Sequence, residues 1–254
     1  KLKGCVNCGP PPSTCSASSV KKMIEWKTDV CQAFNPGSYD YSEFVATTPF
    51  GADCPQITGS NLYRTNPSVN NHSCNPGRAG GDGVAFCMPG LNDATYNPGS
   101  DKALKFEVNI PANHTGSIDH FSFWSVGQNP TPFINAASIN NNHPTKYGLR
   151  VLKDGVQIYN QSDFSIDQVW TLETIYFGTD PDFSYTGGEE FEFQLLAYAP
   201  VGNGYSVSIW DVDEFAIYGC CSEPQTPPCG TITGVTPQDP SNCNTNDGQI
   251  VVQT

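Results

Sequence analysis

Apolar and polar side chains alternate with a period of two along several short stretches of the chain. In 104–110, four apolar residues beginning with Leu104 alternate with three polar ones. In 24–30, Ile24 and Trp26 share one parity, while Glu25 and Lys27 share the other. Successive side chains of a β-strand point to opposite faces of a sheet, so both stretches are predicted to be strands with one buried face.

Further strand-like runs follow at regular intervals and are separated by turn residues. They span 120–126, 147–152, 156–159, 169–177, 190–198, 205–210 and 214–218. Asp154-Gly155 lies between two of these runs, and this dipeptide tolerates the positive φ angles of a tight hairpin. Many short strands at even spacing are typical of a sandwich. We therefore predict an all-β fold, an antiparallel jelly-roll-like β-sandwich.

Composition and charge narrow the class of protein. The 24 glycines and 21 prolines, with only 15% charged residues, suit a turn-rich β domain. Acidic residues outnumber basic ones by 25 to 12, and the formal net charge of -13 disfavours binding to nucleic acid or to an anionic membrane surface. No apolar run reaches the roughly 18 residues of a membrane helix, so we expect no membrane insertion. Since the chain opens at Lys1 without an apolar leader, we expect a mature segment whose signal was removed.

The chain contains eleven cysteines without a repeated metal-type spacing. We expect disulfides formed in an oxidising compartment, so the domain is predicted to be extracellular and disulfide-rich. The odd number leaves at least one cysteine without an intrachain partner in this segment, and we expect its partner beyond Thr254 or on another chain; the alternative is that this cysteine is buried and reduced. The cysteines are Cys5, Cys8, Cys15, Cys31, Cys54, Cys74, Cys87, Cys220, Cys221, Cys229 and Cys243.

A domain boundary is predicted just after the adjacent residues Cys220 and Cys221. Their side chains should reach two different partners, because neighbouring residues of a strand point to opposite faces. We predict the sandwich over 1–221, with a Cys-rich N-terminal part, and a stiff Pro-rich linker over 222–228. The remaining 229–254 is too short to bury its own core and is predicted to begin a small second β module. Its last strand-like run, 249–252, is expected to end without a partner strand.

Two parts of the sequence resemble bacterial surface proteins. The segment "CGTITGVTPQDPSNCNTNDGQIVVQT" resembles the opening of the short Cys-containing β repeats in gliding-motility-type adhesins of Bacteroidetes, with Cys229, Cys243, Asp247 and Gly248 at the matching places. The segments "NNHSCNPGRAGGDGVAFCM" and "FEFQLLAYAPVGNGYSVSIWDVDEFAIYGC" are similar to a domain of large secreted adhesin-like proteins in the same bacteria. The resemblance implies export by type IX secretion and display at the cell surface.

A candidate metal site consists of Asp211, Asp213 and Glu214. The two aspartates share the odd parity of Phe215 and Ile217, so an unbroken strand would aim both carboxylates at the core. Buried, uncompensated carboxylates are costly, and a structural calcium ion would satisfy them with oxygen ligands. The segment 212–214 also resembles the last strand of jelly-roll carbohydrate-binding modules, where an apolar residue and two acids help to hold calcium. The alternative is a turn between two strands with all three acids solvated.

Two aromatic side chains are candidates for ligand binding. Trp124 and Tyr198 have the parity opposite to that of their apolar neighbours Phe123 and Ala197. We therefore predict that both rings lie on an outer face, where they can stack on sugars. Most other aromatic residues are expected in the core.

No pattern indicates an enzyme. The histidines lack metal-ligand spacing, and the sequence contains no Gly-x-Ser-x-Gly nucleophile elbow. The neighbouring acids Glu189-Glu190 and Asp180 with Asp182 could suggest glycoside hydrolysis, but acids in turns are usually only solvated. We predict a protein without catalytic activity.

Two functions fit these features. The first is a cell-surface adhesion module that recognises a glycan through the sandwich face or its loops. The second is a structural module that self-associates into an extracellular fibre or hook, as a homo-oligomer, which the odd cysteine and the truncated repeat favour. The position of the exposed aromatic rings would distinguish a sugar site from a flat self-association surface.

Overall fold

The computed structural model describes most of the predicted strands. The described residues are 19–27, 46–47, 56–64, 73–76, 84–88, 90–100, 102–112, 114–127, 143–201, 208–222, 234–238 and 249–253. The chain divides into two compact units, Pro10–Glu223 and a second unit made of Lys1–Gly9 with Pro224–Thr254. The predicted linker 222–228 lies outside the described residues except for Ser222.

The larger unit contains an eight-stranded sheet whose strands pair in antiparallel fashion. Its main path runs from β11 (Thr171–Tyr176) through β8 (Thr115–Gly127), β14 (Trp210–Ser222) and β1 (Lys21–Trp26) to β2 (Ala46–Thr47). Three short strands complete it: β12 (Ser184–Tyr185) beside β8, β6 (Val84–Met88) beside β14, and β5 (Ser73–Pro76) beside β6.

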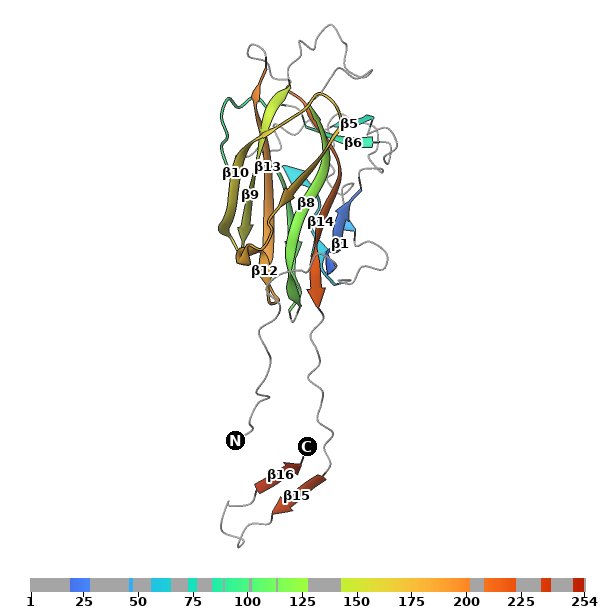
Figure 1. Ribbon diagram of the computed structural model, residues 1–254, viewed down its shortest axis with the longest axis vertical. Helices are drawn as coiled ribbons and strands as arrows, with labels where there is room; N and C mark the ends of the chain where they lie inside the picture. The colour runs from blue at the N-terminus through green and yellow to red at the C-terminus, as the bar shows by residue number, and fades with distance from the viewer. Residues whose placement is uncertain are drawn as a thin grey trace. The chain divides into compact units, whose positions relative to one another are not determined.

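The second sheet of this unit has six strands, again antiparallel. The order is β10 (Val156–Ser165), β9 (Pro144–Lys153), β13 (Glu190–Pro200), β7 (Leu104–Asn109) and β3 (Thr58–Gly59), with β4 (Tyr63–Arg64) also beside β7. Consecutive strands such as β7 and β8, or β13 and β14, lie in different sheets, which is jelly-roll-like connectivity. Figure 1 shows the two layers, and the predicted antiparallel β-sandwich is confirmed.

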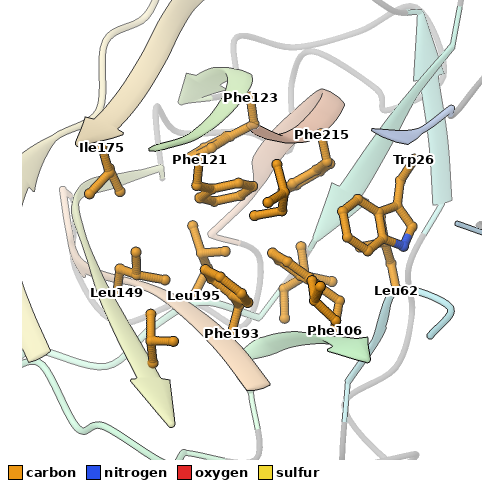
Figure 2. Packing of buried hydrophobic residues seen from close by; sticks show 14 of the residues in the cluster. Trp26, Leu62, Phe106, Phe121, Phe123, Leu149, Ile175, Phe193, Leu195 and Phe215 are labelled. Carbon is orange, nitrogen blue, oxygen red and sulfur yellow. The ribbon is translucent and has the colours of Figure 1, made fainter. Parts of the chain in front are cut away.

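Aromatic rings from both sheets fill the space between the layers (Figure 2). Phe106 on β7 and Phe193 on β13 stack with their ring centroids 4.9 Å apart. Phe121 on β8 reaches across the sandwich to Phe106, at 5.3 Å, and also contacts Phe215 on β14, at 5.8 Å. Phe123 lies 5.3 Å from Phe215 with nearly parallel rings. The burial of alternate residues in β7 confirms the strand that the 104–110 pattern predicted.

The predicted hairpin at Asp154-Gly155 is also confirmed. Asp154 and Gly155 have φ angles of 51° and 77°. Val156 pairs with Lys153 across the turn, so β9 and β10 form one antiparallel unit. The positive φ angles are those that a two-residue turn between right-twisted strands requires.

The strands predicted at 205–210 and 214–218 differ from the structure. Residues 202–207 lie outside the described part, and β14 runs without interruption from Trp210 to Ser222. The predicted solvated turn at 211–214 is therefore wrong, because these residues lie within a strand that pairs with β8 on one side.

A β-bulge explains how β14 stays continuous. Asp213 pairs with Trp124 and Ala216 pairs with Ser122, so Glu214 and Phe215 together face the single residue Phe123. Glu214 has a φ of 49°, the left-handed conformation found at the first residue of G1-type bulges, where glycine is usual. The extra residue changes which parity faces the core.

The change of parity places the two aspartates on the outer face. Upstream of the bulge, Trp210 and Val212 belong to the core, whereas downstream of it Phe215 and Ile217 do. The expectation that Asp211 and Asp213 point into the core is therefore wrong, because it assumed an unbroken alternation.

The smaller unit contains one described hairpin. β15 (Gly234–Gln238) pairs in antiparallel fashion with β16 (Gln249–Gln253). The expectation that the run 249–252 ends without a partner strand is wrong, because β15 supplies one. The remainder of the predicted module 229–254 lies outside the described residues.

The cysteines are only partly within the described chain. Cys220 and Cys221 at the end of β14 are both disulfide-bonded. Cys87 in β6 is a buried thiol, and its cross-strand neighbours are Ser73 and Asp211 rather than cysteines, so a disulfide at this position is not confirmed. Cys74 lies in β5, and the predicted disulfide residues outside the described part are Cys5, Cys8, Cys15, Cys31, Cys54, Cys229 and Cys243.

Candidate functional site

The outer face of the eight-stranded sheet carries Trp124, as its parity predicted. Trp124 on β8 lies opposite Leu172 on β11 and opposite Asp213 on β14. Residues directly opposite one another in an antiparallel pair point to the same face. Leu172 is 50% exposed, and Trp124 is partly exposed, so together they form an apolar surface at this level of the sheet.

A second aromatic row crosses the same face at the level of His120. Tyr176, His120 and Tyr218 are cross-strand neighbours on β11, β8 and β14. The His120 ring lies 5.1 Å from the Tyr176 ring and stacks on the Tyr218 ring at 4.4 Å. Asp119 contacts Nδ1 of His120 at 2.7 Å and fixes the imidazole in the row.

Small side chains separate the two aromatic rows. Ser122 lies between Trp124 and His120 on β8, and its neighbour on β14 is Ala216. The difference in side-chain height leaves a groove of about 380 Å³ on the outer face. Its lining residues are Lys22, Glu25, Trp26, Lys27, Ser122, Trp124, Leu172, Glu214, Phe215, Ala216 and Tyr218.

Charged residues of β1, together with Lys27 just after it, border the groove. Nζ of Lys22 donates a hydrogen bond to Glu25 at 2.8 Å, and Nζ of Lys27 lies 3.9 Å from the same carboxylate. Burial lowers the pKa of Lys22, but the hydrogen bond to Glu25 and the nearby Tyr218 and Glu214 raise it above its ordinary value. Lys22 is therefore charged at neutral pH, and this side of the groove offers both hydrogen-bond donors and acceptors.

Tyr198, the second aromatic candidate, is buried. Its side chain has the predicted parity, but it is only 4% exposed and its ring lies 5.7 Å from that of Tyr96. The hydroxyl of Tyr198 accepts a hydrogen bond from the backbone amide of Asp163 at 2.9 Å. The prediction that Tyr198 is available for ring stacking is therefore wrong, because the segment around Tyr96 covers this part of the second sheet.

The three acids of the candidate metal site lie in β14 at or just before the bulge, and the structure does not bring them together as a ligand set. Asp211 and Asp213 are 2% and 0% exposed, and the backbone amide of Glu214 donates to Oδ1 of Asp213 at 2.8 Å. Within the described part of the chain, no three His, Cys, Asp or Glu residues are grouped so that they could hold a metal ion. Calcium binding near Asp213 stays a prediction, which a calorimetric titration with calcium would test.

The carboxyl of Glu173 links the two sheets at one end of the core. Its Oε2 accepts a hydrogen bond from the hydroxyl of Tyr147 on β9 at 3.0 Å, and its Oε1 accepts one from Ser125 on β8 at 3.4 Å. Burial raises the pKa of Glu173 more than these two hydrogen bonds lower it, and Asp167 raises it further. Protonation of Glu173 is therefore easier in the folded protein than in the unfolded chain.

This raised pKa predicts a pH-dependent stability that Glu173→Gln removes. A group whose pKa is raised on folding stabilises the protein fully below its unfolded pKa, about 4.5 for Glu173, and this contribution is lost as the pH rises through the folded pKa. The wild type should therefore lose stability relative to Glu173→Gln between pH 4 and pH 7. Urea unfolding at both pH values measures the difference, and identical pH dependence in the two proteins would contradict the prediction.

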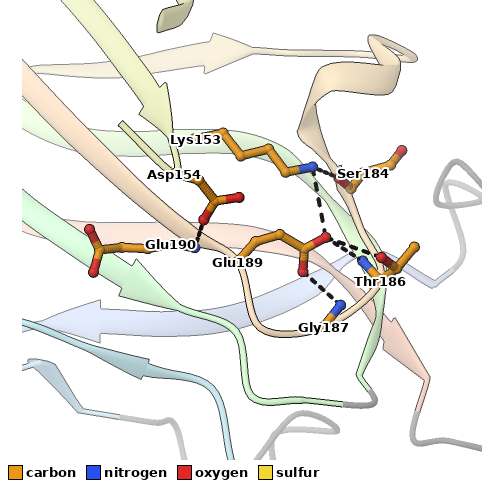
Figure 3. A network of polar contacts seen from close by, with 7 residues as sticks. All are labelled: Lys153, Asp154, Ser184, Thr186, Gly187, Glu189 and Glu190. Atoms are coloured by element: carbon orange, nitrogen blue, oxygen red, sulfur yellow. Dashed lines mark hydrogen bonds and ion pairs between the residues drawn. The ribbon is translucent and has the colours of Figure 1, made fainter. Parts of the chain in front are cut away.

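The acids considered for glycoside hydrolysis have structural contacts instead. Figure 3 shows Glu189, whose carboxylate accepts hydrogen bonds from the backbone amides of Thr186 and Gly187 at 2.8 and 2.6 Å. Nζ of Lys153 lies 3.9 Å from the same carboxylate. Asp180 caps the 3₁₀ turn η5 (Pro181–Phe183) by accepting from the amide of Asp182. These carboxylates hold turns rather than face one another across a cleft.

Comparisons with known proteins add fold-level likenesses only. No family model matches the chain, and no curated protein matches it. Among solved structures, TmCBM61 in complex with β-1,4-galactotriose is 16% identical, with 64% of this chain and 86% of that chain covered and a TM-score of 0.27. A CBM35 from Paenibacillus barcinonensis is 12% identical over 62% and 98% of the two chains, with a TM-score of 0.29.

A third solved structure is the K3 cleaved adhesin domain of Lys-gingipain from Porphyromonas gingivalis. It is 9% identical over 53% of this chain and 73% of that chain, with a TM-score of 0.26. These low scores carry no functional argument.

Among the described residues, no helix is long and apolar enough to cross a membrane.

Proposed function

We propose that the sandwich is an extracellular, non-catalytic adhesion module that binds cell-surface carbohydrate in the groove over β8 and β14. The observation that carries the proposal is the arrangement of Trp124 and Leu172 at one end of the groove, with polar side chains along its border. An aromatic ring stacks on the apolar face of a sugar, and neighbouring carboxylates, hydroxyls and ammonium groups bond to the sugar's hydroxyls.

The position of the groove also suits this role. The side chains that form it project from paired strands of one sheet, so their relative positions are fixed by the backbone hydrogen bonds of β11, β8 and β14. A site on strands loses little entropy on binding, since its groups are already ordered. The net charge of -13 favours neutral partners over polyanions.

Trp124→Ala is expected to weaken glycan binding about tenfold or more, as truncation of a central aromatic contact does. The complete 254-residue chain is first applied to an array of bacterial, plant and animal glycans, and hits are then titrated by calorimetry. Trp170→Ala is the matched control, because Trp170 is also partly buried but does not line the groove. An array without hits, or equal losses in the two variants, would contradict the proposal.

Self-assembly into an extracellular fibre is the alternative function, and one observation favours it. Leu172 and Tyr176 on β11, and Val169 just before it, are 50%, 68% and 69% exposed, and β11 ends the path of the first sheet. An edge strand with apolar side chains can pair with a second copy. Mass photometry at increasing concentration tests this alternative, and a stable monomer would remove it.

A further inference from the structure

The groove has an aromatic surface at each end. Trp124 and His120 are four positions apart on β8 and share its outer face, with Tyr218 stacked on His120. β8 pairs regularly with β11 throughout 120–125, so the two levels are separated by about 13 Å along the strand. The groove contains both Trp124 and Tyr218, and the small residues Ser122 and Ala216 lie opposite one another between these two levels. A single sugar ring cannot contact both ends.

The charges along the groove are balanced. Its lining includes two lysines and two glutamates, and it includes no arginine among the described residues. Lys22 and Lys27 lie 2.8 and 3.9 Å from Glu25, and Glu214 also acts on Lys22, so the two positive charges are balanced by two carboxylates. Acidic sugars are usually held by uncompensated cations, with arginine preferred for carboxylates. The groove therefore offers hydrogen bonds to hydroxyl groups without a surplus of positive charge.

We infer that the groove binds a neutral oligosaccharide chain that lies along β8, with one sugar ring stacked at Trp124 and a later ring at Tyr218. The inference rests on the proposed function and adds to it the length and the charge of the ligand. Binding at two linked positions makes the second contact intramolecular, so affinity should rise steeply once the chain is long enough to reach both ends.

The test uses two matched series of probes in calorimetric titrations of the complete chain. The neutral probes are galacto-, gluco- and manno-oligosaccharides of one to six units, and the acidic probes are oligogalacturonates of the same lengths. For the neutral series that binds, we expect affinity to rise about tenfold or more between one unit and the length that spans the groove. The oligogalacturonates should bind more weakly than neutral chains of equal length.

Variants at the two ends separate the two surfaces. Trp124→Ala and Tyr218→Ala should each remove the gain in affinity with chain length, whereas Trp170→Ala should keep it. Tyr218→Leu, which keeps a bulky side chain but no aromatic ring, replaces Tyr218→Ala if that variant melts at a lower temperature than the wild type.

The possible outcomes distinguish the inference from the proposed function. Binding that is independent of chain length, or tighter binding of oligogalacturonates, would overturn the inference and leave a sugar-binding groove in place. If none of the probes binds and no glycan on the array binds, both the inference and the proposed function are overturned.

Discussion

Phe193→Ala lowers the free energy of unfolding by about 3–5 kcal/mol, the usual cost of removing a buried phenylalanine from a core. The Phe193 side chain is fully buried and stacks on Phe106 within its own sheet. It also crosses the sandwich, with its ring 5.9 Å from Phe121 and 6.2 Å from Phe177. The substitution therefore removes contacts within one sheet and between the two sheets, and it leaves a cavity that the strands cannot close.

Urea denaturation of the oxidised protein measures this loss. Tyr176→Ala serves as the control, because Tyr176 is also aromatic but 68% exposed on the outer face. Its free energy of unfolding should stay within about 0.5 kcal/mol of the wild-type value. Losses of similar size in the two variants would show that Phe193 does not hold the sheets together in this way.

The fold class could be predicted because the alternation of side chains is a local property. In β7, every apolar residue of the 104–110 pattern that lies in the strand is buried. The Asp154-Gly155 turn was equally visible, since its positive φ angles require only two particular residues. Neither feature depends on contacts with distant parts of the chain.

The groove could be predicted only in part. Parity placed Trp124 on an outer face, but it could not show that Leu172 and Asp213 lie opposite this residue, because strand order and register are non-local. Leu172, Tyr176 and Tyr218 belong to strands that the sequence had predicted separately, and their position on the same face was not predicted. Only the pairing of β11, β8 and β14 brings them to one surface.

For Tyr198, parity predicted the face of the sheet but not the burial of the side chain. The orientation of Tyr198 was predicted, but its burial depends on Tyr96, whose ring lies beside it. The Tyr96 ring packs closely on the sheet: a Cβ atom added at Gly148 would lie 2.4 Å from this ring and would collide with it. The hydroxyl of Tyr96 donates to Asn160 at 3.0 Å and holds the segment in place. Alternation identifies the face of a sheet but not whether another segment covers that face.

Deletion of Glu214 should leave the sandwich folded, although Glu214 lies inside a long strand between two buried neighbours. Without this residue, Asp213 stays opposite Trp124, Phe215 lies opposite Phe123, and Ala216 stays opposite Ser122, so the ladder becomes regular. No side chain changes its face, and the left-handed conformation of Glu214 is removed. We expect a free energy of unfolding within about 1 kcal/mol of the wild-type value.

Deletion of Ala216, only two positions further along, should prevent folding. With the downstream half of β14 in place, the shortened strand would turn Phe215 to the outer face and Glu214 into the core. Phe215 then loses its stacks on Phe121 and Phe123, and a carboxylate replaces it, which together cost more than about 5 kcal/mol. If the bulge were kept instead, Ile217 would leave the core and Tyr218 would enter it. Circular dichroism and urea unfolding of both deletion variants test the pair, and equal stability would show that the bulge does not set the faces of β14.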